Sequence, residues 1–466
     1  MTEVTARPSS PPPDGDRFGS SSRLWKIAFL VLMAATLIAL AARWLDGEND
    51  LSDAPVTGVG FTRVAGPDNY VDELARAESA VHNNRVRLSD APEQWLRRAS
   101  YTGALARRAS LTGNYVDLVA IDDELARAFR DAPEGAGPVI GAAAHALTVH
   151  RLDEVEKYLN IADGFAVAPD NGTRAEMLGM RGDVALYRGD YDAALRNYRA
   201  ALHLSEDAGG LIRLYTFELK HGRFDEAAAN IRRAGATAKT PSPYLAAFYF
   251  LRLADVGLAS GDWTMAQENI DAANHAFQGW WLAEAYRAQM LALNGDVAGA
   301  VALYTQVANR SHDPLVMDAL GSLLRANGRI AESRQWAARA QVIWDRRMAA
   351  LPSAARGHAI EHELALGDPA KALRIAAADY KARPYGQAAI MLATAQLANG
   401  QTEKALALLK RTEKSGWVSA RAWALQAEAE ALLGHGKASD RARTEAEKID
   451  PKVFDPAQSY IWFGHG

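Results

Sequence analysis

The sequence predicts an all-α protein: an α-solenoid of helical hairpins, preceded by one N-terminal transmembrane helix. Two observations predict the solenoid. A short phrase, glycine-polar-hydrophobic-x-x-small, recurs at spacings of 33 to 39 residues, a period typical of stacked hairpins. On both sides of each copy, apolar residues recur at the spacing of one helix face. The transmembrane helix is predicted by an uncharged apolar run from Ile27 to Ala42.

The N-terminal residues divide into three segments. Residues 1–22 are rich in proline and serine and predict a disordered cytoplasmic tail. Residues 24–45 predict the transmembrane helix, with membrane-interface residues at both ends, namely Trp25, Lys26, Arg43 and Trp44. The two tryptophans lie about 28 Å apart along a helix, which matches a hydrocarbon core of about 30 Å. Residues 46–66 predict a linker.

The charges around the apolar run predict its orientation. Arg17, Arg23 and Lys26 precede it, whereas only Arg43 follows closely before an acidic stretch. The positive-inside rule therefore places the N-terminus in the cytoplasm. In a bacterium, which the alanine- and arginine-rich composition suggests, the chain is then a single-pass inner-membrane protein with a periplasmic repeat domain. A cleaved signal peptide is an alternative with the same topology, because Ala39-Leu40-Ala41 forms a small-x-small site.

Residues 67–451 predict the repeat array, and residues 452–466 a C-terminal tail. A helix is expected over 70–81, the first repeat helix is expected to open near Ser89, and about ten units should cover 92–451. In each unit the glycine ends the first helix, because a left-handed backbone is most easily adopted without a Cβ. Histidine replaces it in one copy. The ten turn positions are Gly113, His150, Gly189, Gly222, Gly261, Gly295, Gly328, Gly367, Gly400 and Gly434.

The unit around Gly189 shows what the remaining positions do. Tyr191 is expected to wedge between the two helices, and the small residues Ala194 and Ala201 allow the backbones to approach. Together with Gly182 and Tyr198, these positions resemble the tetratricopeptide repeat (TPR) superfamily, most clearly over 175–204 and 208–237. Departures include Ser333 for alanine and Pro369 at a wedge position. The resemblance implies hairpins that stack into a superhelix and bind protein partners.

Composition and motifs exclude several classes of function. The chain has no cysteine, which excludes disulfides, thiol catalysis and cysteine-bound metals. A net charge of −4 gives no general attraction to nucleic acid. No phosphate-binding glycine loop or nucleophile elbow follows a predicted strand. We therefore expect no cofactor, no nucleic-acid partner, no small-molecule substrate and no enzymatic activity.

One motif, in contrast, is typical of an enzyme. His358, Glu361 and His362 form H-x-x-E-H, the inverted zinc-protease signature. On a helix the two histidines share a face, and Glu361 has the position of a general base. A protease also requires a third ligand and a closed active-site fold, which a repeat helix does not offer. The motif therefore predicts a remote alternative, a zinc metallopeptidase, and more simply two polar residues on a solvated helix face.

The TPR resemblance implies that the first helix of each hairpin lines a concave groove. The outward positions of these helices mix donors, acceptors and one aromatic residue, without a carboxylate clamp. They are Arg213, Thr216, Lys220, Arg252, Asp255, Tyr286, Gln289, Asp318, Ser322, Arg325, His358, Glu361 and Thr394. Large aromatics at repeat spacing are interpreted as core rather than partner anchors, namely Trp263, Trp280, Trp281, Trp336 and Trp344.

The expected function is a non-enzymatic, membrane-anchored scaffold that binds a protein partner in the cell envelope through this groove. An alternative is a scaffold for export of a polysaccharide or envelope polymer. That alternative requires solvent-facing aromatics along the groove, and only Tyr286 fits.

Overall fold

The computed structural model describes residues 51–52, 59 and 64–464. The predicted tail 1–22 and transmembrane helix 24–45 lie outside the described residues, as does most of the predicted linker. Within the described residues, no helix is both long enough and apolar enough to cross a membrane. Residues 53–466 belong to one compact unit, and the description below concerns that unit.

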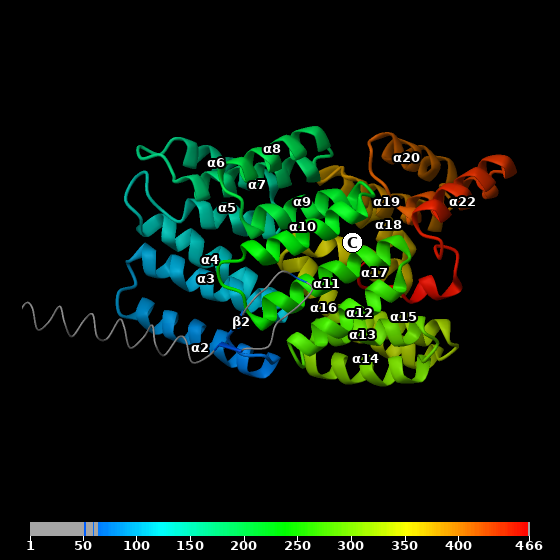
Figure 1. The fold of residues 1–466 in the computed structure, drawn as a ribbon, viewed down its shortest axis with the longest axis horizontal. Coiled ribbons are helices and arrows are strands. Elements are labelled where there is room, and N and C mark those ends of the chain that lie inside the picture. The colour runs from blue at the N-terminus through cyan, green and yellow to red at the C-terminus, as the bar shows by residue number, and fades with distance from the viewer. Residues whose placement is uncertain (1–50, 53–58, 60–63, 465–466) are drawn as a thin grey trace, which may run out of the picture. The chain divides into compact units, whose positions relative to one another are not determined.

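The described chain is almost entirely helical (Figure 1). Two short strands, β1 (Leu51–Ser52) and β2 (Val64–Ala65), and one helix, α2 (Tyr70–Ser89), which packs against the first repeat helix, precede the repeats. Five hairpins follow: α3 (Trp95–Thr112) with α4 (Tyr115–Asp131), α5 (Val139–Thr148) with α6 (Leu152–Asp163), α7 (Asn171–Tyr187) with α8 (Tyr191–Leu204), α9 (Ala208–Lys220) with α10 (Phe224–Thr237), and α11 (Pro243–Ser260) with α12 (Trp263–Ala276).

Five more hairpins complete the array: α13 (Trp281–Leu293) with α14 (Val297–Ser311), α15 (Pro314–Ala326) with α16 (Ile330–Ala350), α17 (Pro352–Ala365) with α18 (Pro369–Ala382), α19 (Gly386–Ala398) with α20 (Thr402–Lys414), and α21 (Ala420–Leu432) with α22 (Gly436–Ile449). A 3₁₀ helix, η1 (Pro456–Tyr460), follows them. The predicted α-solenoid of about ten hairpins is confirmed.

The predicted turn positions lie between the two helices of every hairpin. Nine of the ten have a positive φ, including His150 at 58°. Gly367 differs, because the carboxylate of Glu363 closes that turn by accepting a hydrogen bond from the Asp368 backbone N–H at 2.9 Å. Asp368 then caps α18, which Pro369 begins. The proline is compatible with a first helical position, where its missing N–H costs nothing.

The interior of the hairpin α7–α8 shows why the repeat needs small residues. Ala194 and Ala201 are buried between the helices, and Tyr198 packs with them. A β-carbon on Gly182 would clash with the Tyr198 ring. Tyr191 begins α8 and its hydroxyl accepts a hydrogen bond from the Gly386 N–H at 2.9 Å. The wedge residue therefore also joins hairpins that are far apart in sequence.

The start of the array differs from the prediction. The expected helix at Tyr70 begins there but continues to Ser89, and the first repeat helix begins at Trp95 rather than near Ser89. The sequence Asp90-Ala91-Pro92 follows the end of α2, because a residue before proline disfavours helical backbone. Ala91 instead closes the last turn by donating to the Leu88 carbonyl.

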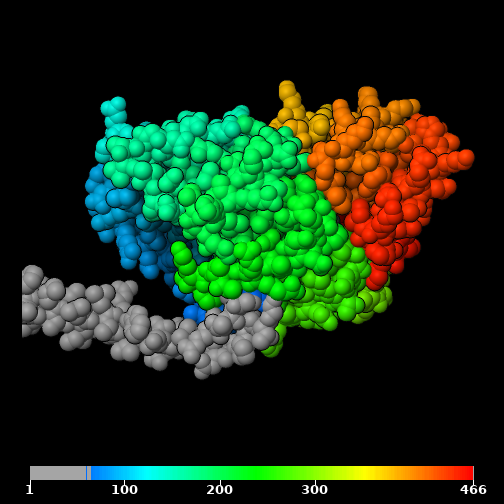
Figure 2. Space-filling model, turned by 45° about the horizontal axis from the view of Figure 1, so that its top comes forward, coloured from blue at the N-terminus to red at the C-terminus, as the bar shows by residue number. Residues whose placement is uncertain are grey.

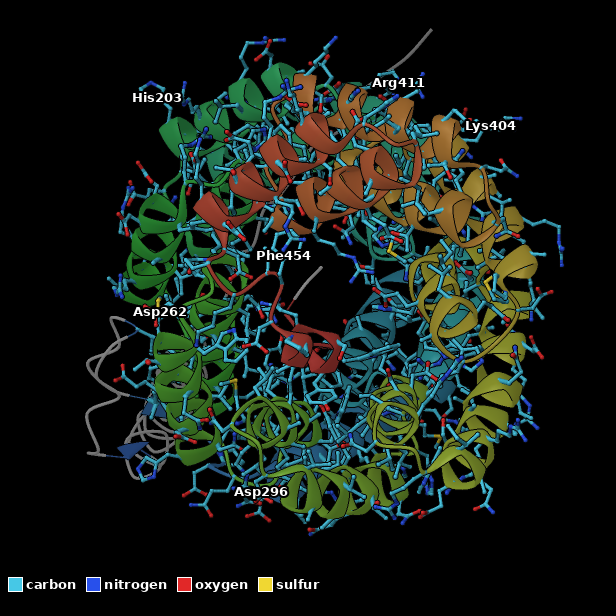
Figure 3. All side chains as sticks on the ribbon, turned by 90° about the vertical axis from the view of Figure 1, so that its right-hand side faces the viewer. His203, Asp262, Asp296, Lys404, Arg411 and Phe454 are labelled. Atoms are coloured by element: carbon cyan, nitrogen blue, oxygen red, sulfur yellow. The ribbon has the colours of Figure 1, made fainter. Side chains whose placement is uncertain are left out.

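Successive turns of the solenoid touch directly. The Trp281 indole donates to the Leu111 carbonyl at 3.2 Å, and the Val418 N–H donates to the Lys220 carbonyl at 2.9 Å. Figure 2 shows the orange surface of the later hairpins against the green surface of the middle ones. The largest buried cluster runs through the middle hairpins, α9 to α16, and includes Phe463 from beyond the last repeat. The helices thus form a ring around an inner surface (Figure 3).

Candidate protein-binding groove

The inner surface already holds a piece of the chain itself. After α22 the chain turns inward, and Figure 3 shows the segment with Phe454 and the following residues inside the ring, whereas His203 and Lys404 lie at its rim. The 3₁₀ helix η1 contacts α13 and α15, both first helices of their hairpins. Residues 455–464 are called the docked segment below.

Gln289, at the middle of α13, binds the backbone of the docked segment. Its Oε1 accepts hydrogen bonds from the N–H groups of Trp462 at 2.6 Å and Phe463 at 2.7 Å. Its Nε2 donates to the Phe463 carbonyl at 3.0 Å. The side chain is 0% exposed, so these bonds are made away from water, where leaving any partner unpaired is costly. One amide side chain thus binds the backbone of two consecutive residues and makes no hydrogen bond to their side chains.

The side chain of Phe463 is 6% exposed and lies against two aromatic rings. Its centroid is 5.4 Å from that of Tyr286 and 6.5 Å from that of Tyr304. Gly464 follows with a φ of 81°. A β-carbon there would lie 2.6 Å from Leu258 Cδ1 and 2.7 Å from Asp255 Oδ1. We call these five residues of α11, α13 and α14 (Asp255, Leu258, Tyr286, Gln289 and Tyr304) the docking site.

A buried ion pair supports the docking site from α11. Arg252 Nη2 lies 3.1 Å from Asp255 Oδ2, and the Tyr286 hydroxyl donates to Asp255 Oδ1 at 2.7 Å. The Tyr215 hydroxyl donates to the Arg252 carbonyl at 3.1 Å. Burial raises the pKa of Tyr286 well above its ordinary value, and the charge of Asp255 raises it further. The phenol therefore stays protonated and keeps donating to the carboxylate.

A cavity of about 290 Å³ adjoins the docking site. It is lined by Lys220 of α9, by Gln387 of α19, by Trp417, by Arg421 of α21, and by part of the docked segment. Burial lowers the pKa of Lys220 to about 8, with Asp255 opposing the shift and Arg252 adding to it. We call this space the cationic cavity, because the side chains of Lys220 and Arg421 both line it.

The other predicted groove residues on α9, α15 and α19 have local partners. Arg213 Nε donates to Asp183 at 2.7 Å, and Arg325 Nη1 to the Ala365 carbonyl at 2.5 Å. The hydroxyls of Thr216 and Thr394 donate to carbonyls of their own helices. Ser322 is half-buried on α15. The docked segment thus brings together Asp255, Tyr286 and Gln289 from the predicted set, and Lys220 lies beside them in the cationic cavity.

The H-x-x-E-H motif does not form the face that the sequence suggested. His358 is exposed and its Nδ1 pairs with Glu361 at 3.0 Å, but His362 is 1% exposed. The His362 Nδ1 bonds Asp318 at 2.6 Å and its Nε2 bonds Gln341 at 3.0 Å. The interpretation as two residues on a solvated face is therefore wrong for His362. Because both of its ring nitrogens have partners, it is not available as a metal ligand as it stands.

The tryptophans are core residues, as interpreted from their spacing. Trp263, Trp280, Trp281 and Trp344 are buried, and Trp344 donates to Asp318 at 2.7 Å. Trp336 is partly buried and carries the guanidinium of Arg339 over its ring. Tyr286, the one aromatic that fitted a sugar-binding groove, lies under Phe463 and is 3% exposed.

The docked segment and the cavity residues Trp417 and Arg421 are not among the residues predicted from the sequence. The segment lies beyond the last repeat, so the repeat pattern says nothing about it. A signal was present, however: Ile461-Trp462-Phe463-Gly464 is an apolar aromatic run, and such a run is rarely left in solvent. Among the described residues, no cluster of acidic and histidine side chains could hold a metal ion.

No protein-family model matches the sequence, and no curated protein matches it. Solved structures of TPR-type repeat proteins are similar in fold. They include a chain of the APC/C hetero-tetramer Cut9–Hcn1 (15% identity, 82% of this chain and 74% of that one, TM-score 0.44). A Rap protein complexed with competence and sporulation factor has 12% identity over 68% of this chain and 98% of that one, with TM-score 0.42. Yeast Tom70 has 13% identity over 82% and 96%, with TM-score 0.32. The described residues of this chain themselves form ten helical hairpins.

Proposed function

We propose that this protein is a non-enzymatic scaffold that binds a segment of a protein partner on the inner surface of its TPR-type solenoid. The observation that carries the proposal is the set of hydrogen bonds between Gln289 and the backbone of Trp462 and Phe463. They show that the inner surface accommodates a polypeptide segment and satisfies its peptide groups. Main-chain recognition combined with a side-chain pocket is a general way in which proteins bind peptides.

We further propose that residues 24–45 anchor the chain in the inner membrane, with the repeats in the periplasm and the partner in the cell envelope. The apolar run and its flanking tryptophans support an anchor, and the basic residues before it support a cytoplasmic N-terminus. Anchoring would raise the effective concentration of the solenoid for partners near the membrane.

Site-specific photocrosslinking in cells tests the scaffold. A photoreactive residue at Gln387 faces the cationic cavity, and one at Lys404 lies on the outer rim. We expect a discrete protein adduct from position 387 and none of the same mass from position 404. Equal labelling from the two positions would contradict binding on the inner surface.

Cysteine labelling tests the topology, since the natural chain has no cysteine. Lys404→Cys should react with a membrane-impermeant maleimide in intact spheroplasts. Thr5→Cys, in the proposed cytoplasmic tail, should react only after lysis. The opposite pattern would reverse the proposed orientation, and labelling of both residues in intact spheroplasts would argue against an anchor.

A further inference from the structure

We infer that the docking site recognises a partner segment in which an aromatic residue is followed directly by glycine, and that Phe463-Gly464 holds this site as an intramolecular competitor. The inference rests on the proposed function, because it names the chemistry of the partner segment. It makes binding of a partner conditional on release of the docked segment.

The aromatic requirement comes from the surroundings of Phe463. Its ring is enclosed by Tyr286 and Tyr304 and belongs to the largest buried cluster of the described chain. An aliphatic side chain would fill less of that space and lose the ring contacts, and aromatic pairs contribute beyond the area they bury. The pocket therefore selects an aromatic residue at this position.

The glycine requirement is independent of the aromatic one. Gly464 has a left-handed backbone, which other residues rarely adopt. Its α-carbon also lies so close to Leu258 and Asp255 that any β-carbon would overlap both. Asp255 is held by Arg252 and Tyr286 and cannot move aside without breaking that network. Any residue larger than glycine is thus excluded.

The docked segment does not satisfy the site completely. The Tyr304 hydroxyl, Arg252 Nε and Trp462 Nε1 are buried and have no hydrogen-bond partner among the described residues. Two of these donors belong to the solenoid. A partner segment that places a hydrogen-bond acceptor beside its aromatic residue can satisfy Tyr304 or Arg252, whereas the docked segment does not. Such a segment can therefore compete, even though the docked segment has the advantage of a covalent link.

A peptide-binding experiment tests this inference with the full-length chain in detergent. The probe is a fluorescent peptide of residues 455–466, and binding is measured by fluorescence polarisation. Phe463→Ala removes the aromatic residue from the competing segment but leaves the docking site unchanged. We expect this variant to bind the peptide more tightly than the wild type, on the order of tenfold or more, because the wild-type segment competes at high effective concentration.

Two controls define the site. Adding Gln289→Leu to Phe463→Ala should abolish the gain, and a peptide with Gly464→Ala should not bind either protein. Circular dichroism and thermal melting verify that each variant is folded. If Phe463→Ala does not fold, Gly464→Ala in the full-length chain serves instead, because the clash with Leu258 and Asp255 expels the segment. Equal peptide binding by the wild type and a folded released variant would overturn the inference.

The same peptide separates this inference from the proposed function. Added to the crosslinking reaction of the Phe463→Ala chain, it should suppress the adduct at position 387. An adduct that persists in saturating peptide would overturn the inference and leave the scaffold function standing. Peptide binding without any inner-surface adduct would instead support the docking site and contradict the proposed scaffold function, because no partner would then bind on the inner surface.

Discussion

Two neighbouring parts of the inner surface, the docking site and the cationic cavity, differ in whether the docked segment fills them. At the docking site the chain covers its own groove: the docked segment buries Tyr286, and Gln289 makes three hydrogen bonds to the backbone of Trp462 and Phe463. In the adjoining cationic cavity, Lys220 and Arg421 line a space of about 290 Å³, and burial lowers the pKa of Lys220 to about 8. The first part is occupied by a segment of the chain, and the second is an open space lined by two cationic side chains.

This difference indicates that the docking site contributes mainly to the stability of the fold, whereas the cationic cavity is suited to binding a ligand. Groups that are buried and paired contribute to the folded state only as long as every partner remains. Lys220 is partly buried and its pKa is lowered by burial, so its charge carries a cost in the folded state that an anionic ligand can offset. Substitutions at the docking site should therefore destabilise the protein, whereas neutral substitutions in the cationic cavity should have little effect or stabilise it.

The largest effect is expected for Asp255→Leu. This change leaves the buried Arg252 without its carboxylate and the Tyr286 hydroxyl without its acceptor. Breaking a buried ion pair from one side costs about 3–5 kcal/mol, measurable by urea denaturation. Removing both charges with Arg252→Met/Asp255→Leu should recover much of the loss. Asp440→Leu, at an exposed position on α22, is the matched control and should change little; a comparable loss there would refute the comparison.

Phe463→Ala should have an intermediate effect. The ring leaves the space between Tyr286 and Tyr304, but the segment can move into water, which limits the loss to about 1–3 kcal/mol. Hydrogen exchange should show faster exchange of the Trp462 and Phe463 amides while the hairpins stay protected. Phe454→Ala is the control, because Phe454 lies under the Arg443 guanidinium and outside the docked segment. Unchanged protection of both amides in Phe463→Ala would show that the aromatic contacts do not hold the segment.

Lys220→Met should stabilise the protein at neutral pH, by about 1 kcal/mol. The folded state lowers the pKa of Lys220 from 10.5 to about 8, so below pH 8 both states are protonated and the wild type bears the full desolvation cost. Between pH 8 and 10.5 the unfolded chain binds more protons than the folded one, and wild-type stability rises with pH. The advantage of the variant should therefore shrink over this range. A difference in melting temperature that is constant from pH 7 to 10 would contradict the lowered pKa.

The sequence predicted the hairpins far better than the groove. Turn glycines, wedges and small residues act within one hairpin, so their pattern is visible locally, and even His150 has the left-handed backbone expected of the glycine it replaces. Gly367 is the exception among the turn positions, because its φ is not positive and the Glu363 carboxylate closes the turn instead. The contacts between Gln289 and Phe463 join residues 174 positions apart. No periodic pattern in the sequence predicts such a pair. The burial of His362 against Asp318 could not be predicted for the same reason.

The smallest effect is expected for Arg421→Met, and it tests the cationic side of the comparison. Arg421 lines the cationic cavity, and its side chain is exposed. Because the folded state gains little from this charge, the free energy of unfolding should change by about 0.5 kcal/mol or less. Arg383→Met is the matched control: that guanidinium is buried in a two-bond pair with Asp379, so its loss should cost several times more. If the two arginine variants melt at the same temperature, Arg421 contributes as much to the free energy of unfolding as Arg383 does. The proposed difference between the docking site and the cationic cavity would then be wrong.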